Sequence, residues 1–288
     1  MVKIMREKSG FILSAFGDEI DDDVDKQFQV LNSLNIGYLD LRKAWGTNVA
    51  DLSDSQVNNL KLDCERYLIK VSCIGSPVGK SLITDDLKST IDIFERILSI
   101  AVSLGTDKVR IFSFYPPEYE HQDAYIKESV TRLKAMAGIA RNYGITLLME
   151  NEKGLMGDTP ERCSAILNGV GSKNLKFVWD TGNFPHSGVG NSVDRGWPIL
   201  SEYVNCVQVK DARLSDRKIT VAGDGDGQVL ELLERLRDSG YRGFLALEPH
   251  LKLAGNRGGF SGPTGMSEAA SALRNLIDKT GCDEIKTP

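Results

Sequence analysis

The 288-residue sequence lacks the features that mark membrane-spanning and nucleic-acid-binding proteins. No stretch approaches the roughly 20 apolar residues of a membrane-spanning helix, and no apolar segment follows the charged start as in a secretory signal. Lysine and arginine form no clusters, and the net charge is −5, so we expect neither nucleic acid nor an anionic membrane surface as the main partner. The predicted location is cytoplasmic, and the predicted ligand is a small molecule.

Cysteine and glycine patterns exclude further classes of site. The five cysteines include no Cys-x-x-Cys pair and are odd in number, so we interpret them as reduced and mostly structural. The first predicted strand is followed by GDEIDDD and not by the Gly-x-Gly-x-x-Gly of dinucleotide-binding folds. The stretch AGDGDG (222–227) begins like a calcium-binding EF-hand loop but lacks the glutamate at loop position 12, and we expect a flexible loop there.

What the sequence does contain is a regular alternation of strand and helix patterns. Segments with helical spacing separate eight short apolar runs rich in β-branched residues. The runs are FILSAF (11–16), IGYLDL (36–41), KVSCIG (70–75), KVRIFSF (108–114), ITLLMEN (145–151), LKFVWD (175–180), NCVQVKD (205–211) and GFLALE (243–248). An eightfold alternation over this length predicts an α/β fold, a single-domain (β/α)₈ TIM barrel over residues 1–288. A doubly wound open sheet is the alternative.

Oxygen-donor side chains follow the apolar runs of four consecutive predicted strands. These side chains are Glu150, Asp180, Gln208 and Glu248, on strands five to eight. Because the C-terminal ends of barrel strands meet at one face, we expect the four to be neighbours in space. For any one of them alone, a helix cap or a partner of a lysine stays open as the alternative interpretation.

Three carboxylates held together in a partly desolvated site need a compensating cation. A divalent metal bound by Glu150, Asp180, Gln208 and Glu248 is the simplest source of that charge. The donors are all oxygens, without Cys or His, which favours Mn²⁺ or Mg²⁺ over tetrahedral Zn²⁺. The sequence therefore predicts a metal site at the C-terminal face of the barrel.

Five motifs occur in order along the chain: LLMENEKG, FVWDTGNF, VQVKDA, AGDGDG and GYRGFLALEPHL. Together they resemble the motifs of the xylose isomerase-like TIM-barrel superfamily, the sugar isomerase/epimerase group. In that family Glu, Asp, His and Glu from strands five to eight hold a metal, and the two glutamates flank the substrate carbon that loses or gains a proton. The resemblance implies that Glu150 and Glu248 are catalytic bases as well as metal ligands, with Asp180 as a further ligand.

The chain departs from the family pattern at three positions. Gln208 stands where the family usually has the histidine ligand, Asn183 where many members have histidine, and Met149 where close relatives often have one. An amide oxygen binds a hard cation but does not take up a proton as imidazole does. Metal binding therefore stays predicted, whereas the proton-transfer partners are altered. The three histidines of the whole chain are too few for the three-zinc site of endonuclease IV-like members, so we do not expect DNA repair.

Five further residues are candidates for substrate binding because they follow strand ends. They are Lys153, His186, Lys210, Arg213 and His250. Lysine and arginine bind hydroxyl or acid groups, although Lys210 also fits a role in neutralising the carboxylates around it. The Gly-rich stretch 254–265, after the last strand, is a candidate lid over the pocket.

The resemblance implies proton transfer next to a carbonyl group. We predict a divalent-metal-dependent sugar isomerase or epimerase that acts through an enediolate on a keto-sugar or related polyol. The same enediolate can expel a β-substituent, so a metal-dependent dehydratase or lyase acting on an oxo-sugar or a 3-oxo-glycoside, like a C-deglycosidase, is the first alternative. A non-catalytic binding or partner subunit is the second. Barrels of this kind often associate, which keeps a homo-oligomer or a partner subunit open.

Overall fold

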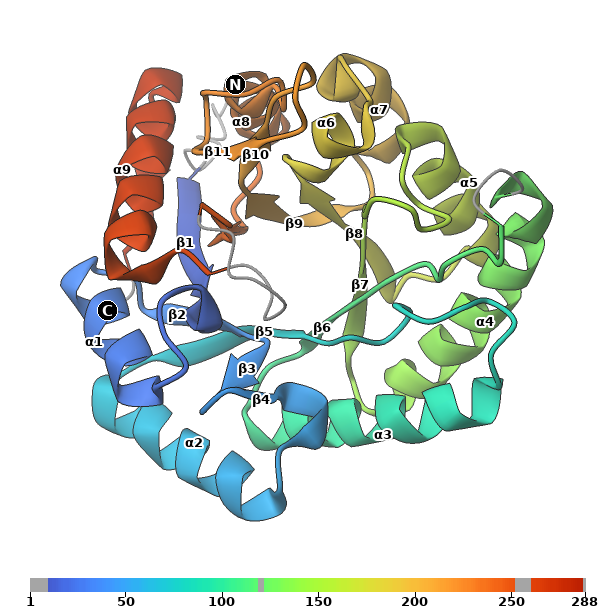
Figure 1. Ribbon diagram of the computed structural model, residues 1–288, viewed down its shortest axis with the longest axis horizontal. Coiled ribbons are helices and arrows are strands. Elements are labelled where there is room, and N and C mark those ends of the chain that lie inside the picture. The colour runs from blue at the N-terminus through green and yellow to red at the C-terminus, as the bar shows by residue number, and fades with distance from the viewer. Residues whose placement is uncertain (1–9, 119–121, 252–259, 287–288) are drawn as a thin grey trace, which may run out of the picture.

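Eight parallel strands close into a barrel in this computed structural model, which describes residues 10–118, 122–251 and 260–286 (Figure 1). The strands are β1 (Gly10–Phe16), β2 (Tyr38–Leu41), β5 (Lys70–Gly75), β6 (Lys108–Ile111), β7 (Thr146–Glu150), β8 (Leu175–Asp180), β9 (Val204–Val209) and β12 (Phe244–Leu247). Each pairs with the next, and β12 pairs in parallel with β1, which closes the cylinder. This topology confirms the predicted TIM barrel and excludes the open sheet.

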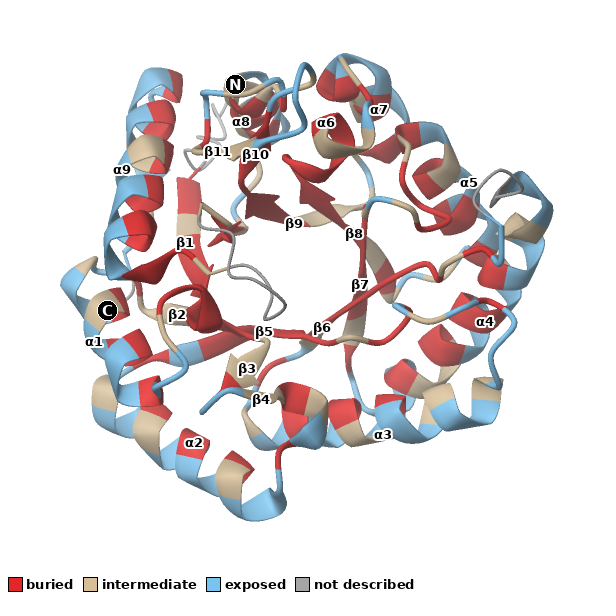
Figure 2. Cartoon of the chain, in the orientation of Figure 1, coloured by how far each residue is buried: buried red, intermediate tan, exposed pale blue. Residues whose placement is uncertain are grey.

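Helices surround the strands in a ring (Figure 1). Their bounds are α1 (Val24–Ser33), α2 (Asp54–Tyr67), α3 (Leu87–Ser103), α4 (Gln122–Asn142), α5 (Pro160–Val170), α6 (Asn183–Ser187), α7 (Ser192–Leu200), α8 (Val229–Ser239) and α9 (Gly262–Thr280). Figure 2 shows buried helix faces toward the barrel and exposed faces outside, as amphipathic sequences dictate. Among the described residues, no helix combines the length and the apolar character needed to cross a membrane.

Short elements build the rim at the C-terminal ends of the strands. The 3₁₀ turn η1 (Gly17–Glu19) follows β1, and the hairpin of β3 (Lys43–Ala44) and β4 (Thr47–Asn48), continued by η2 (Val49–Asp51), follows β2. The hairpin of β10 (Asp211–Ala212) and β11 (Ile219–Thr220) follows β9. At the opposite end, β13 (Asp283–Glu284) pairs with the start of β1. The rim elements therefore surround the face on which the sequence predicts the site.

Local sequence explains where several helices begin and end. Ser53 and Gln56 form a reciprocal capping box at the start of α2, and Thr159 caps α5 directly ahead of Pro160. Gly240 adopts a left-handed conformation at the end of α8, where a residue without a Cβ is favoured. These signals place the helices between the strands and so fix the alternation.

The barrel interior holds a small apolar cluster below a polar layer. Its apolar members are Phe16, Cys73, Leu148, Val178, Cys206 and Ala246. Beside them, the hydroxyls of Ser14 and Ser72 donate to the carboxylate of Asp40 at 3.0 and 2.6 Å. All five cysteines are buried and none forms a disulfide, as expected of reduced, mostly structural cysteines.

The segments after β6 and β9 differ from expectation. Strand β6 ends at Ile111 and not at residue 114, because the amides of Phe112 and Phe114 donate to the loop carbonyls of Val78 and Gly79 and not to a neighbouring strand. The AGDGDG stretch is expected to be a flexible loop, but three of its backbone N–H groups donate to the buried carboxylate of Asp211. Of the candidate lid, residues 252–259 lie outside the described ranges.

Candidate active site and metal centre

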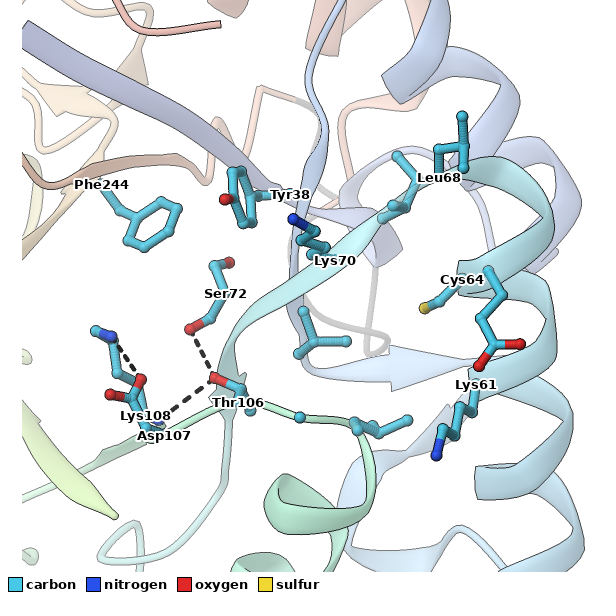
Figure 3. A pocket seen from close by; sticks show the side chains of 15 residues that line it. Tyr38, Lys61, Cys64, Leu68, Lys70, Ser72, Thr106, Asp107, Lys108 and Phe244 are labelled. Atoms are coloured by element: carbon cyan, nitrogen blue, oxygen red, sulfur yellow. Dashed lines mark hydrogen bonds and ion pairs between the residues drawn. The ribbon is translucent and has the colours of Figure 1, made fainter. Parts of the chain in front are cut away.

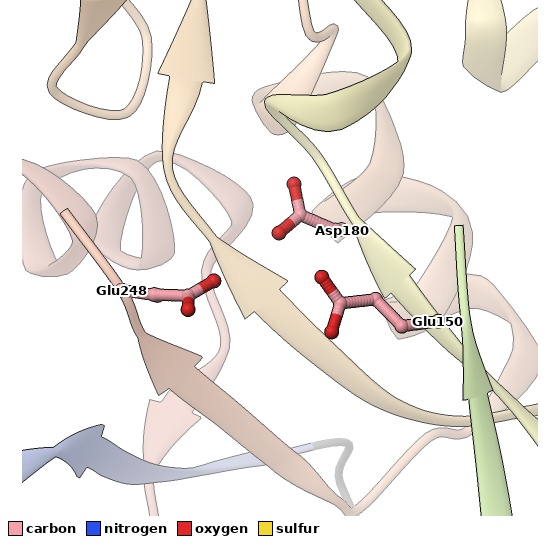
Figure 4. A group of neighbouring side chains, drawn as sticks. All are labelled: Glu150, Asp180 and Glu248. Atoms are coloured by element: carbon pink, nitrogen blue, oxygen red, sulfur yellow. The ribbon is translucent and has the colours of Figure 1, made fainter. Parts of the chain in front are cut away.

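Three carboxylates converge at the C-terminal face of the barrel (Figure 4). Glu150 is the last residue of β7, Asp180 is the last of β8, and Glu248 directly follows β12. Their side chains are buried, and one oxygen of each lies within 4.8 Å of the others. The barrel thus brings together three of the four predicted donors because each ends a strand that points to the same face.

Gln208, the fourth predicted donor, lies beside Glu150. One end of its amide is 2.9 and 3.0 Å from the two oxygens of the Glu150 carboxylate. If that end is the NH₂ group, it donates to the carboxylate. If it is the carbonyl oxygen, three oxygens face one another and require a cation between them. Either orientation keeps Gln208 in the cluster, and the second is the one that metal binding needs.

Lys210 sits between two of the carboxylates. Its ammonium Nζ is 2.7 Å from Asp180 Oδ2 and 2.9 Å from Glu248 Oε2, and the residue is buried. Burial lowers the pKa of Lys210, but the adjacent Asp180 and Glu248 outweigh it and raise that pKa above its ordinary value. These ion pairs fit the alternative role considered for Lys210, neutralisation of its acidic neighbours.

Two arginines that the sequence did not single out contact the same cluster. Arg42, just after β2, donates Nη1 to Glu248 Oε1 and Nη2 to Glu19 Oε1 at 3.0 Å. Arg110, within β6, places Nη1 3.1 Å from Glu150 Oε2. Each proposed catalytic glutamate thus has its own arginine.

The sequence alone could have indicated the role of Arg110, because a charged residue within an apolar strand is unusual. It interrupts the apolar run KVRIF, and its guanidinium lies 4.2 Å from the centre of the Phe112 ring. A charged residue in the middle of a barrel strand points inward only if a partner compensates it. Glu150 is that partner, and it lies at the end of β7, the strand that pairs with β6.

The carboxylates differ in proton affinity because their neighbours differ. Burial raises the pKa of Glu150 to about 8 against the opposing effect of Arg110, with Glu248 and Asp180 adding to the rise. Burial raises the pKa of Asp180 to about 6, although Lys210 opposes it. For Glu248, burial is outweighed by Lys210, His250 and Arg42, which hold its pKa well below the ordinary value.

The charges of the described ion pairs leave room for a divalent cation. Six carboxylates contact four lysine and arginine side chains around the site, so the acids outnumber these bases by two. The acids are Asp18, Glu19, Glu150, Glu152, Asp180 and Glu248, and the bases are Arg42, Lys80, Arg110 and Lys210. A metal ion of charge +2 would balance that excess. The oxygen donors and the residual charge therefore fit a divalent metal.

His250 turns back toward the site and does not point into solvent. Its Nδ1 lies 2.7 Å from Glu19 Oε1 and its Nε2 lies 3.5 Å from Glu248 Oε1. The backbone of His250 is left-handed, with φ of 49°, a conformation that is uncommon for residues other than glycine and clusters at functional sites. Of the five candidate substrate-binding residues, His250 and Lys210 thus reach the carboxylate cluster.

The other three candidates lie farther out on the rim. Arg213 pairs with Asp216 of its own hairpin at 3.0 Å, which draws its side chain away from the carboxylates. His186 places Nδ1 2.9 Å from the carbonyl oxygen of Arg217. Lys153 is exposed on the loop after β7. The structure does not bring these three to the cluster.

A cavity of about 170 Å³ lies beside the carboxylates. Its lining includes Arg42, Lys80, Arg110, Phe112, Glu152 and His250. Lys80 belongs to the loop after β5, pairs with Glu152 at 2.7 Å and lies over the Phe112 ring. A small polar ligand in this cavity would contact charged groups on one side and an aromatic ring on the other.

A second cavity, of about 580 Å³, lies at the opposite end of the barrel (Figure 3). It is lined by the first residues of β2, β5, β6 and β12, which are Tyr38, Lys70, Lys108 and Phe244. Among the described residues, no second cluster of three potential metal-ligating side chains was found. This cavity is therefore not assigned as the active site despite its size, because TIM-barrel enzymes place their active sites at the C-terminal ends of the strands.

Amide and glycine contacts hold the strand ends in place. Asn183 donates Nδ2 to Glu150 Oε1 at 3.0 Å, so the amide at this family histidine position orients the carboxylate. Asp211 accepts four backbone N–H groups, from Ala212 and from three glycines of AGDGDG. A Cβ on Gly227 would lie 2.7 Å from Asp211 Oδ1, so the loop must be glycine there.

The fold and the site agree with the match of the chain to a protein-family model. Residues 28–276 match the xylose isomerase-like TIM barrel family. The match covers most of the chain, and the protein belongs to that family.

Two curated relatives are similar over part of the chain. The uncharacterised protein MJ1311 of Methanocaldococcus jannaschii is 25% identical over 166 residues, which are 56% of this chain and 57% of the relative. The probable L-ribulose-5-phosphate 3-epimerase UlaE of Mycoplasma pneumoniae is 24% identical over 140 residues, 46% of this chain and 45% of the relative. The alignments span about half the length of these relatives.

Solved structures of low sequence identity share the fold. D-psicose 3-epimerase of Clostridium cellulolyticum H10, solved with D-tagatose, has a TM-score of 0.73 at 17% identity, covering 93% of this chain and 99% of that one. The probable 3-DHS dehydratase AsbF of Bacillus anthracis has a TM-score of 0.72 at 17% identity, and the match covers 92% of this chain and 99% of that one. The IOLI protein, solved with a bound zinc atom, has a TM-score of 0.76 at 15% identity, and the match covers 94% of this chain and 99% of that one. The fold neighbours thus include an epimerase and a probable dehydratase.

Proposed function

We propose that the protein is a divalent-metal-dependent sugar isomerase or epimerase that moves a proton next to a carbonyl group through an enediolate. The observation that carries the proposal is the buried cluster in which Glu150 and Glu248 approach each other beside Asp180. A relative named as a probable sugar-phosphate epimerase and a fold neighbour solved with a ketose support a carbohydrate substrate.

The metal would be held by Glu150, Asp180, Gln208 and Glu248, with Mn²⁺ or Mg²⁺ favoured by the oxygen donors. Such an ion, when bound, polarises a carbonyl and a neighbouring hydroxyl and stabilises the negative charge of the enediolate. A fold neighbour contains zinc, so the metal content of the purified protein must be measured and not assumed.

The chain's own residues would carry the proton. One of Glu150 and Glu248 removes the proton from carbon, and the other returns it to the opposite face or to the neighbouring carbon. Arg110 and Arg42 hold the two carboxylates in position. Phe112, in the wall of the cavity, offers an apolar surface that keeps water from part of the site.

Substrate contacts follow from the distance of each candidate to the cluster. Lys210 and His250 would contact groups near the reacting carbon, whereas Lys153, His186 and Arg213 would contact only a substrate that extends to the rim. The cytoplasmic location and an association into homo-oligomers or with a partner subunit stay predictions.

Metal analysis and hydrogen exchange test the proposal together. Purified protein should contain a divalent ion, and in D₂O it should introduce deuterium at the carbon next to the carbonyl of a keto-sugar, observed by NMR. The Glu150→Gln variant should lose both properties. Glu152→Gln is the matched control for bound metal, because Glu152 lines the same cavity but pairs with Lys80 outside the cluster. Absence of bound metal and indifference of stability to chelator would contradict the metal assignment.

Elimination is the second candidate, favoured by the amides at two positions where the family has histidine. Asn183 contacts Glu150, and Gln208 lies beside it, so neither position supplies an imidazole for returning the proton. An enediolate that is not reprotonated expels a β-substituent. A dehydratase or lyase would yield an unsaturated product or a released aglycone, whereas no exchange and no product across a broad panel of sugars would favour a non-catalytic binding protein.

A further inference from the structure

The ammonium group of Lys210 lies between Asp180 and Glu248, where a metal ion bound by these two carboxylates would lie. Its Nζ lies 2.7 Å from Asp180 Oδ2 and 2.9 Å from Glu248 Oε2. Both are charge-assisted contacts, and the lysine is 4% exposed, so water does not replace them. The ammonium thus already supplies a cation to two of the three carboxylates.

The surrounding backbone fixes Lys210 in that position. The hydroxyl of Thr181 donates to the carbonyl oxygen of Lys210 and accepts from its N–H at 3.3 Å. The side chain passes directly over Gly182, where a Cβ would lie 2.6 Å from Lys210 Cγ. A residue with a side chain at 182 would displace the lysine stem, so this glycine leaves the path open.

An ammonium and a metal ion cannot both occupy this position. A metal bound to Asp180 and Glu248 would lie at bonding distance from carboxylate oxygens that are within 3 Å of Nζ. Two cations at such a separation repel each other strongly in a buried site. Metal binding therefore requires the Lys210 side chain to leave these oxygens.

From this geometry we infer that Lys210 is a resident cation that competes with the divalent metal for Asp180 and Glu248 and thereby weakens metal binding. The inference rests on the proposed metal-dependent function and adds how its metal site is regulated. Without metal, the lysine supplies one positive charge to Asp180 and Glu248, and loading exchanges that cation for the metal ion at these two carboxylates. Loading and unloading then need not unfold the site, in contrast to structural metal centres.

Titration with MnCl₂ tests the inference at fixed pH and ionic strength. Isothermal calorimetry, with free Mn²⁺ followed by electron paramagnetic resonance, gives the affinity without any assay of activity. Lys210→Met should bind Mn²⁺ at least about tenfold more tightly than the natural chain, because the competing charge is gone. Lys210→Arg keeps the charge and should show no gain. Lys80→Met is the matched control, since Lys80 lines the cavity but pairs with Glu152, and it should change the affinity less than about threefold.

The possible results separate the competition from the proposed function. Equal affinity of the natural chain and Lys210→Met overturns the competition and leaves the metal site standing. Binding by Lys210→Met alone supports the competition and overturns metal dependence of the natural protein. Binding by neither protein overturns both.

A measurement on the natural chain covers the case in which Lys210→Met does not fold. The ¹³Cε signal of Lys210, observed by NMR in protein with labelled lysine, should shift on saturation with diamagnetic Mg²⁺ as the ammonium leaves the two carboxylates. The signal is assigned through its absence in Lys210→Arg. A signal that stays unchanged when Mg²⁺ is bound overturns the inference.

Discussion

Nδ1 of His250 lies 2.7 Å from Oε1 of Glu19, which joins the loop after the last barrel strand to the turn after the first. Glu19 is fully buried, and its other oxygen accepts from the backbone N–H of His250 and from the hydroxyl of Ser261. Residues 250 and 261 stand on either side of the undescribed stretch 252–259. Glu19 therefore holds His250 and Ser261, one on each side of that stretch, at the site.

Glu19→Gln should lower the free energy of unfolding at neutral pH by about 3 kcal/mol. Burial raises the pKa of Glu19, but His250 and Arg42 outweigh it and lower the pKa from 4.5 to about 2. A depressed carboxyl pKa stabilises the folded state above pH 4.5, and this contribution is lost as the pH falls toward 2. Urea unfolding at pH 7 and at pH 3 measures the difference.

Glu95→Gln is the control for Glu19, because Glu95 is an exposed acid on α3 for which the expected change is below about 0.5 kcal/mol. A Glu19→Gln variant that loses as much stability at pH 3 as at pH 7 would show that the loss comes from packing and not from the charge.

Asp40→Asn should stabilise the protein at neutral pH by about 3 kcal/mol. Burial raises the pKa of Asp40 from 3.8 to about 6, against the opposing hydrogen bonds from Ser72 and Ser14. A raised carboxyl pKa means that the folded state binds more protons than the unfolded state, so stability falls as the pH rises from about 4 to 6. The asparagine removes this penalty, and thermal unfolding at pH 8 and at pH 4 should show a gain only at pH 8. An equal gain at both values would sink the explanation.

Asp211→Asn should destabilise the protein by about 2 kcal/mol, because an amide NH₂ would face backbone N–H groups that now donate to a carboxylate. The loss concerns the contacts with Gly223, Gly225, Gly227 and Ala212. Denaturant unfolding measures it. Asp216→Asn on the same hairpin is exposed and should change stability by less than about 0.5 kcal/mol, so an equal loss in both variants would contradict the prediction.

Gln208→His should raise the affinity for Zn²⁺ by at least about tenfold while changing the affinity for Mg²⁺ little, because imidazole is the softer donor. Competition with a fluorescent chelator measures both constants. Gln29→His, on the exposed side of α1, is the control for an added surface histidine. A gain of the same size in both variants would mean that the new histidine does not bind at the carboxylate cluster.

The sequence by itself determined the barrel and the placement of the oxygen donors. Alternating strand and helix patterns are local signals, and a strand that ends on Glu150 or Asp180 must present that residue at the common face once the barrel closes. The position of Gln208 beside Asp180 follows from the same register, since the two residues are paired across β8 and β9. These features depend on position along a strand and were therefore readable from one chain.

Only the tertiary structure decided which charges meet. Arg42 is 206 residues from Glu248 in the sequence, and its guanidinium nevertheless contacts that carboxylate. Lys210 and Arg213 follow the same strand, yet one enters the cluster and the other pairs with Asp216. The choice depends on distances across the barrel and on the cost of burying a charge without a partner, and neither quantity is present in the spacing of residues along the chain.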